Sequence, residues 1–251
     1  MSVFIAFRKE WLELIRSYRL LVVAIMLVFF GLTSPFLAKF TPELMTLIPT
    51  GEITISMPPA TVMTAIGQYI KNMAQFGIIL GLLLTMGSVA QEKDKGTAAM
   101  MLVKPLPRGA FLGAKFLSLA TMFAIALAAA GIACYYYTLL LFEAMNILHW
   151  FVLNALVFVY VMVIVAITIF CSTITKSQVA AGGSALGLLI IPGSIGSILG
   201  LGKYLPGELI TWGTRLMAGD TSASWIALGI SFGLIVIPLL AAWLVFKNQE
   251  L

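Results

Sequence analysis

The sequence predicts an all-α integral membrane protein, with one amphipathic helix at the N-terminus followed by six transmembrane helices. Of its 251 residues, 61% are hydrophobic and only 10% are charged, whereas an average soluble domain has about 25% charged and about 45–50% apolar residues. A globular protein of this composition could not cover its own surface with polar groups. Six apolar segments are long enough to cross a bilayer, so residues 1–251 are expected to form a single transmembrane domain.

The segment before the first apolar run, residues 2–18, predicts an amphipathic helix. Apolar side chains recur there at helical spacing, at Phe4, Phe7, Trp11, Leu14 and Ile15. Charged side chains fill the other face, which is typical of a helix that lies in the membrane interface against anionic lipid. The alternative is an ordinary soluble helix packed on a core. The interfacial helix is favoured because the chain offers no soluble core.

Each of the six apolar segments that follow predicts one membrane-spanning helix. The predicted spans are residues 20–38, 70–90, 116–142, 150–173, 179–201 and 223–246. Pro35 falls in the last turn of the first span, where a helix tolerates a proline or ends. The more polar connection at residues 39–70 has room for a short helix near residues 63–71.

The fifth span differs from the others because it is rich in glycine and contains a proline. Small residues let helices approach closely in lipid, and Pro192-Gly193 predicts a broken helix. The segment after this break is expected to be re-entrant or a separate short helix, which lipid tolerates only against protein or a cavity. The residues expected to form a gate or a close helix contact are Gly183, Gly187, Pro192, Gly193 and Gly196. Generic small-residue packing explains them equally well.

The basic residues predict the orientation of the chain. If the N-terminus, the 91–115 loop, the turn at Lys176 and the C-terminal tail share one side, the opposite side holds only four of the 15 lysines and arginines, namely Lys39, Lys71, Lys203 and Arg215. An excess of basic residues marks the cytoplasmic side. Both termini are therefore expected in the cytoplasm.

The sequence contains no motif for catalysis, nucleotide binding or metal binding. The glycine-rich residues 200–204 lack the spacing of a phosphate-binding loop. His149 has no partner for catalysis, Cys134 and Cys171 predict free thiols, and the centres of the spans hold no ionisable relay residue. The net charge of +5 does not predict nucleic-acid binding, because the basic residues gather at the ends of apolar segments. The energy source is therefore expected outside this chain.

Residues 91–115 are the longest polar interruption between two spans. Thr97 is a suitable N-cap for a short helix over residues 98–103, and Pro105 ends that helix because the residue before a proline avoids it. Methionine and leucine on this helix suit docking into a groove of a partner. The alternative is a solvated loop that only follows the positive-inside rule.

This loop resembles the signature of the permease subunits of type 2 ABC transporters, the ABC-2 exporter family. In that family the second span ends in the pattern E-x-x-x-G-T-x-x-x-L-L-x-x-P-x-x-R, and a lysine opens the third span. The matching residues here are Glu92, Gly96, Thr97, Met101, Leu102, Pro105, Arg108 and Lys115. Met101 stands where leucine is usual, and Pro107 stands where a small residue such as serine is common.

The resemblance implies that residues 2–18 are an elbow helix and that the 91–115 loop holds a coupling helix contacting a separate cytosolic ATPase subunit. ATP and Mg²⁺ would then belong to that partner, and this chain would hold no cofactor and no metal. A second permease copy, or a paralogous permease, would complete the unit in the plasma membrane of a prokaryote, in contact with membrane lipid. A path between the two permeases would carry the cargo.

Two other functions remain open on the residues. One is a membrane anchor or scaffold subunit of an ABC-like complex that does not itself move cargo. The other is an intramembrane enzyme, which the missing catalytic motifs disfavour. The sequence identifies no cargo.

Overall fold

The computed structural model describes residues 2–46, 60–94 and 107–248, and these residues form helices and turns without any strand. The predicted all-α class is therefore confirmed. The helices in chain order are α1 (Ser2–Arg16), α2 (Arg19–Thr46), α3 (Val62–Thr85), α4 (Ala90–Asp94), α6 (Arg108–Leu141), α7 (Ile147–Ile174), α8 (Gln178–Ile198), the 3₁₀ turn η1 (Gly202–Tyr204), α9 (Gly207–Met217) and α10 (Trp225–Asn248).

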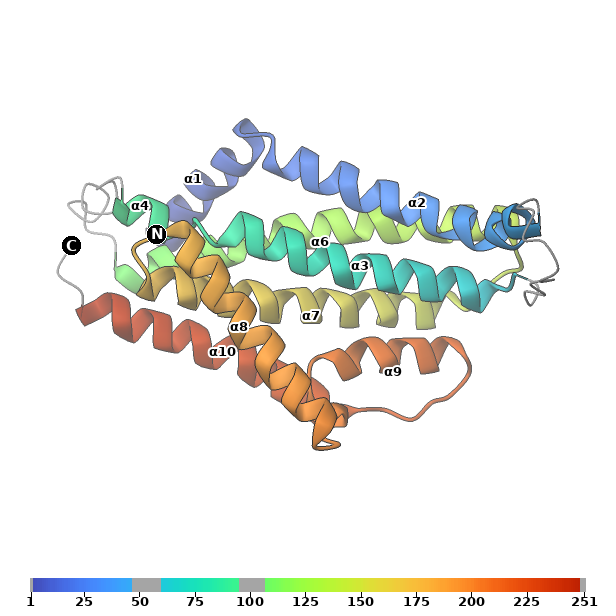
Figure 1. Ribbon diagram of the computed structural model, residues 1–251. Helices are drawn as coiled ribbons and strands as arrows, with labels where there is room; N and C mark the ends of the chain where they lie inside the picture. Colours follow the sequence, from blue (N-terminus) through green and yellow to red (C-terminus); the bar gives the residue numbers. More distant parts are fainter. Residues whose placement is uncertain (1, 47–59, 95–106, 249–251) are drawn as a thin grey trace.

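Six of the described helices are long and apolar enough to cross a membrane, namely α2, α3, α6, α7, α8 and α10, so the protein is a multi-pass membrane protein. Helix α7 is the centre of the bundle and contacts α3, α6, α8, α9 and α10. In its most apolar stretch 67% of the residues are buried, against 22% for α8 and 17% for α10. Figure 1 shows α2, α3 and α6 on one side of α7 and α10 on the other, with α8 crossing α7 obliquely.

The predicted break at Pro192-Gly193 is wrong, because α8 continues through Pro192 to Ile198. Pro35 and Pro42 likewise lie inside α2, which extends to Thr46. A proline removes one backbone donor and bends the helix, but ending the helix in lipid would leave several backbone groups without partners. Continuing the helix is therefore the cheaper solution. A separate short helix, α9, does lie between α8 and α10. It is formed by residues that were predicted to be a polar connection.

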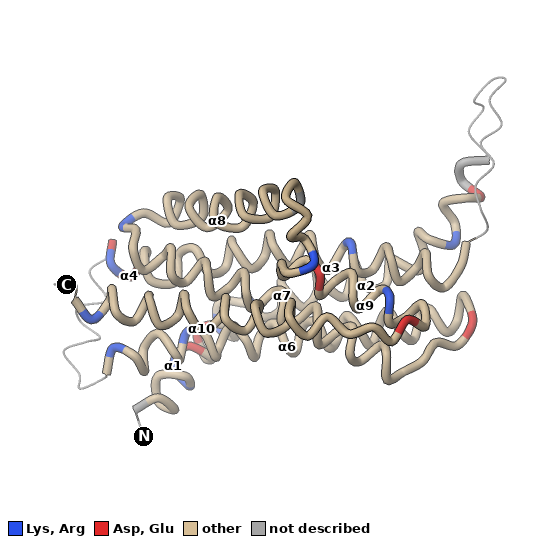
Figure 2. Tube along the Cα trace, turned by 90° about the horizontal axis from the view of Figure 1, so that it is seen from below, with Lys and Arg blue, Asp and Glu red and all other residues tan. Residues whose placement is uncertain are grey.

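Figure 2 shows one group of charged residues at the end that carries α1, α4 and the end of α10, and a second group spread from the end of α8 and from α9 toward the far end. We call the uncharged stretch between the two groups the charge-free band. The start of α1, α4, the start of α6 and the end of α10 lie at one end of the bundle (Figure 1). The charge-free band is the part of the molecule expected to lie in the hydrocarbon core of a bilayer.

A sharp bend at residues 86–89 separates α3 from α4, and Ser172 of α7 bonds to both of its sides. The Ser172 hydroxyl donates to the Met86 carbonyl at 2.8 Å and accepts from the backbone N–H groups of Val89 at 3.1 Å and Ala90 at 3.0 Å. Ser172 is fully buried, so no water molecule could replace its hydroxyl as the hydrogen-bond partner of these backbone groups. The bend turns α4 toward α1 and α6.

We expect Ser172→Ala to lower the free energy of unfolding by about 2 kcal/mol, because it leaves buried backbone groups of the bend without a partner. Thermal unfolding in detergent measures the loss. The matched control is Thr168→Val on the same helix, since the buried Thr168 hydroxyl bonds only to the Ile164 carbonyl of its own helix. Equal losses in the two variants would contradict the role given to Ser172.

Candidate functional site

The structure describes three of the eight residues predicted for the loop, and all three lie at the end of the bundle that holds the start of α1 and the end of α10. Glu92 lies in α4, Arg108 begins α6, and Lys115 lies two turns further along α6. The other five predicted loop residues lie outside the described residues, as does the predicted coupling helix; they are Gly96, Thr97, Met101, Leu102 and Pro105.

Lys115 is almost fully buried, with 4% of its surface exposed, and two helices supply its counter-charges. Its ammonium nitrogen lies 2.7 Å from Glu92 Oε1 and 3.1 Å from Glu10 Oε2. Lys9 bonds to the other oxygen of Glu10 at 3.0 Å and lies 3.9 Å from Glu92 Oε1. We call Lys9, Glu10, Glu92 and Lys115 the Lys115 cluster. It joins α1, α4 and α6, because a buried ammonium needs paired carboxylates close to it.

Glu10 was not among the predicted site residues, although it lies in the predicted amphipathic helix. The side of α1 that faces the bundle consists of Ala6, Glu10 and Leu14, spaced four residues apart. This side is rotated by about a quarter turn from the apolar side chains that marked the helix, since each residue advances a helix by about 100°. Phe4 is 71% exposed, so much of the apolar side is left for lipid. The sequence feature that could have identified Glu10 as a site residue is its spacing of four residues from both Ala6 and Leu14.

The electrostatic balance keeps Glu10 ionised. Burial alone would raise the pKa of its carboxyl group, but the ammonium groups of Lys115 and Lys9 outweigh burial and lower it below its ordinary value of 4.5. For Lys9, burial lowers the pKa, and the neighbouring Glu10, Glu92 and Glu13 carboxylates outweigh burial and raise it. Each group thus stabilises the charged form of the other.

Arg108 holds the other end of the predicted loop. Its Nη1 donates to the carbonyl oxygens of Phe246 at 2.6 Å and Lys247 at 2.7 Å, in the last turn of α10. A guanidinium group at this position satisfies carbonyls that have no partner inside the helix and complements the helix dipole. The Phe246 ring stacks on Phe111 of α6 at 5.5 Å between centroids. The start of α6 and the end of α10 are therefore joined.

The glycines predicted for a gate lie on a helix that this single chain leaves largely uncovered. A Cβ added at Gly183 would meet nothing within 4 Å, and one added at Gly187 would meet only Ile191 of the same helix at 4.0 Å. At Gly196, by contrast, a Cβ would lie 2.5 Å from Leu205, so the helix end packs closely on the η1 segment. Pro192 and Gly193 line a cavity between α7, α8 and α9. Their role as a gate stays a prediction.

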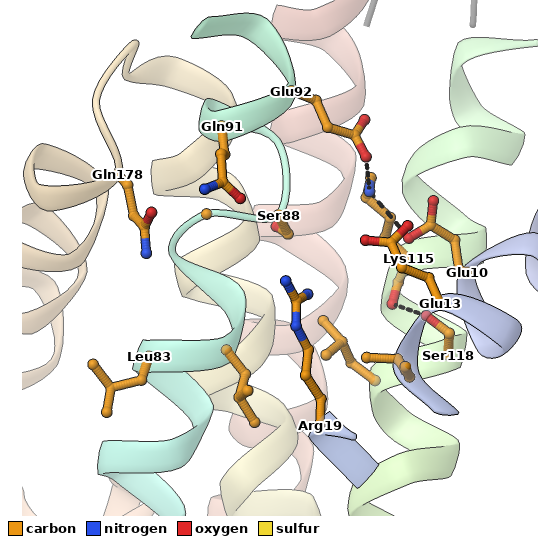
Figure 3. Close-up of a pocket in the computed structure, with 14 residues that line it drawn as sticks. Glu10, Glu13, Arg19, Leu83, Ser88, Gln91, Glu92, Lys115, Ser118 and Gln178 are labelled. Atoms are coloured by element: carbon orange, nitrogen blue, oxygen red, sulfur yellow. Dashed lines mark hydrogen bonds and ion pairs between the residues drawn. The ribbon is translucent and has the colours of Figure 1, made fainter. Parts of the chain in front are cut away.

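A cavity of about 140 Å³ lies beside the Lys115 cluster, and its lining comes from α1, α2, α3, α4, α6, α8 and the bend after α3 (Figure 3). The carboxylates of Glu10, Glu13 and Glu92 and the ammonium of Lys115 occupy one side. The opposite side is lined by Arg19, Ser88, Gln91 and Gln178 (Figure 3). No pattern in the sequence predicts this cavity, because the residues that line it come from segments far apart in the chain.

Comparison with known proteins gives two matches. The family described as "ABC-2 family transporter protein" matches residues 4–251. The chain is also 28% identical over 251 residues to the "Uncharacterized transmembrane protein YxlG" of Bacillus subtilis (strain 168), and the match covers 97% of this chain and 95% of that relative. The similarity therefore extends from α1 to the C-terminal residues.

We expect Lys115→Met to lower the free energy of unfolding by about 3 kcal/mol, because it leaves the largely buried carboxylates of Glu10 and Glu92 without their common cation. Adding Glu10→Gln and Glu92→Gln should restore most of this loss. Lys176→Met is the matched control, since Lys176 is exposed and its loss should cost less than about 0.5 kcal/mol. A Lys115→Met protein as stable as this control would refute the cluster.

The lowered pKa of Glu10 predicts a pH dependence of stability. Its contribution is complete above pH 4.5 and is lost as the pH falls through the lower pKa of the folded state. Unfolding temperatures measured from neutral pH downward should therefore fall more steeply below pH 4.5 in the unmodified protein than in Glu10→Gln. Identical slopes in the two proteins would contradict this expectation.

Proposed function

Since the chain belongs to the ABC-2 family of transporter proteins, it is a membrane permease subunit at the level of the family, and we propose that it works as the permease of an exporter driven by a separate cytosolic ATPase. The ATPase docks on residues 91–115 and binds the ATP and Mg²⁺, while this chain contributes the membrane path. The lipid bilayer is a prokaryotic plasma membrane, and both termini face the cytoplasm.

The observation that carries this proposal is the way in which both ends of the signature loop are held. Glu92 is tied to Lys115 and, through it, to Glu10 of α1. Arg108 is tied to the last carbonyls of α10. A partner that pushes on the segment between these two residues would therefore act on α1, α3, α6 and α10 together. A solvated connector would need no such attachments.

The proposed orientation rests on the charges of the described residues. Nine described lysines and arginines belong to α1, the start of α2, α4, the start of α6, the turn between α7 and α8 or the end of α10, whereas the other four are Lys39, Lys71, Lys203 and Arg215. This excess of basic residues favours the cytoplasmic side of the membrane for the loop. A cytosolic ATPase subunit could reach the loop only on that side.

A second permease copy completes the proposed unit. Helix α8 leaves aliphatic side chains exposed in the charge-free band, with Ile190 60%, Ile191 59% and Ile195 51% exposed. Together with Gly183 and Gly187, which leave open space beside the backbone, this surface suits close packing of two helices in lipid. A paralogous permease would serve the same purpose.

The test is co-purification of this chain with a cytosolic ABC ATPase subunit encoded in the same genome. We expect the pair of substitutions Met101→Asp and Leu102→Asp to weaken ATPase binding at least about tenfold, because charges replace the apolar side chains of the docking surface. The double variant Gly96→Asp/Thr97→Asp should have the same effect.

The control variant is Thr221→Asp/Ala223→Asp, which adds the same charge to exposed residues at the far end of the bundle. It should leave assembly and coupled ATP hydrolysis unchanged. Intact assembly and coupled hydrolysis in both loop variants would refute the docking assignment. Intact assembly with hydrolysis that no cargo stimulates would favour a scaffold subunit.

A further inference from the structure

The cavity beside the Lys115 cluster has a second side that the proposed function does not use. Its lining there comes from the first turn of α2, the bend after α3, α4 and the first turn of α8, through Arg19, Ser88, Gln91 and Gln178. In Figure 3 the Arg19 guanidinium points toward Ser88, and the amide groups of Gln91 and Gln178 extend into the same space. Four hydrogen-bond donors from four segments thus surround one cavity.

These donors have no partner among the residues that the structure describes. The Ser88 hydroxyl oxygen is buried and makes no hydrogen bond. Arg19 makes no ion pair within 4.0 Å of a described carboxylate, although Glu13 also lines the cavity. A buried hydroxyl without a partner is costly, and a half-buried guanidinium beside it calls for an anion. This combination points to a ligand that accepts hydrogen bonds and has a negative charge.

The backbone around Arg19 directs the guanidinium into the cavity. Tyr18, between α1 and α2, has a positive φ of 58°, which residues other than glycine rarely adopt. This residue lies at the apex where α1 and α2 meet at a sharp angle (Figure 1). The chain then returns toward the bundle at Arg19, whose side chain is half-buried.

Gly87 keeps the cavity open on the side of α8. A Cβ at this position would lie 3.2 Å from the amide carbon of Gln178 and 3.3 Å from its oxygen, so any larger residue would displace that amide. The membrane-side edge of the cavity is apolar, with Leu83 54% exposed. Ile79, one turn further toward the band, is 40% exposed.

The acidic residues of the cavity do not oppose an anion at Arg19. Glu10 and Glu92 bond to Lys115, and Glu10 and Glu13 lie within 3.5 Å of Lys9. The two lysines therefore balance two of these three negative charges, and Arg19 supplies a third positive charge to the cavity. Figure 3 also places these carboxylates on the side of the cavity opposite Gln91 and Gln178.

From this arrangement we infer that the cavity binds the phosphate group of a phospholipid from the adjacent leaflet, with Arg19, Ser88, Gln91 and Gln178 as its hydrogen-bond donors. Phosphate oxygens accept several hydrogen bonds at once and match a guanidinium group. The acyl chains lie over Leu83 and Ile79, between α2 and α8. The cavity lies at the boundary of the charge-free band, and its edge on that side is apolar. This position favours a lipid over free phosphate, because inorganic phosphate has no apolar part that could contact this edge.

The test uses the purified full-length chain in a phosphate-free maltoside detergent, with phosphatidylglycerol as the probe and native mass spectrometry as the readout. Dioleoylglycerol, which has the same chains without phosphate, and inorganic phosphate alone are the two comparison ligands. We expect saturable binding of phosphatidylglycerol and little binding of either comparison ligand. Arg19→Gln should weaken phosphatidylglycerol binding about tenfold, and Ser88→Ala about threefold.

Arg16→Gln is the matched control, because Arg16 is exposed three residues before Arg19 and does not line this cavity. It should change binding less than about twofold, since exposed charges are screened. Equal losses for Arg16→Gln and Arg19→Gln, or unchanged binding in both Arg19→Gln and Ser88→Ala, would overturn the site. Inorganic phosphate that binds as tightly as the lipid would overturn the lipid assignment. None of these outcomes depends on an ATPase partner.

Discussion

The buried ammonium group of Lys115 is the contact on which the end of the bundle that carries α4 depends. It sits 2.7 Å from Glu92 and 3.1 Å from Glu10, in a site where an unpaired charge would be strongly destabilising. Glu10 comes from α1 and Glu92 from α4, so neither helix can leave α6 without exposing or stranding a charge. The remaining attachments, Ser172 at the bend and Arg108 at α10, hold the same region from the opposite side.

This arrangement explains how the amphipathic helix α1 and the five-residue helix α4 keep fixed positions. Helix α1 has much of its apolar surface turned away from the bundle, as the exposed Phe4 and Ile5 show, so apolar packing alone does not fix its rotation. The Glu10 carboxylate does. Helix α4 is too short to be stable alone, and bonds from Ser172 and Lys115 define it. The position of Glu92 is thereby tied to α1 and to α6.

The sequence predicted the membrane class and the six apolar helices well, because about 20 consecutive apolar residues have few alternatives to a spanning helix. It failed at Pro192, where the cost of unpaired backbone in lipid outweighs the preference of proline against helix interiors. It also placed Lys115 at the opening of the third span but not its partner Glu10, 105 residues earlier. Such a contact depends on how helices pack. The cavity beside the Lys115 cluster could not be predicted for the same reason.

The most direct test of the central claim is a double-mutant cycle on the two carboxylates. Glu10→Gln, Glu92→Gln and the double variant are unfolded in detergent, and their free energies of unfolding are compared. If one ammonium joins both helices, the double variant strands Lys115 and loses about 1–2 kcal/mol more than the sum of the single losses. Losses that add to within about 0.5 kcal/mol would show that α1 and α4 are held independently, and would contradict the account.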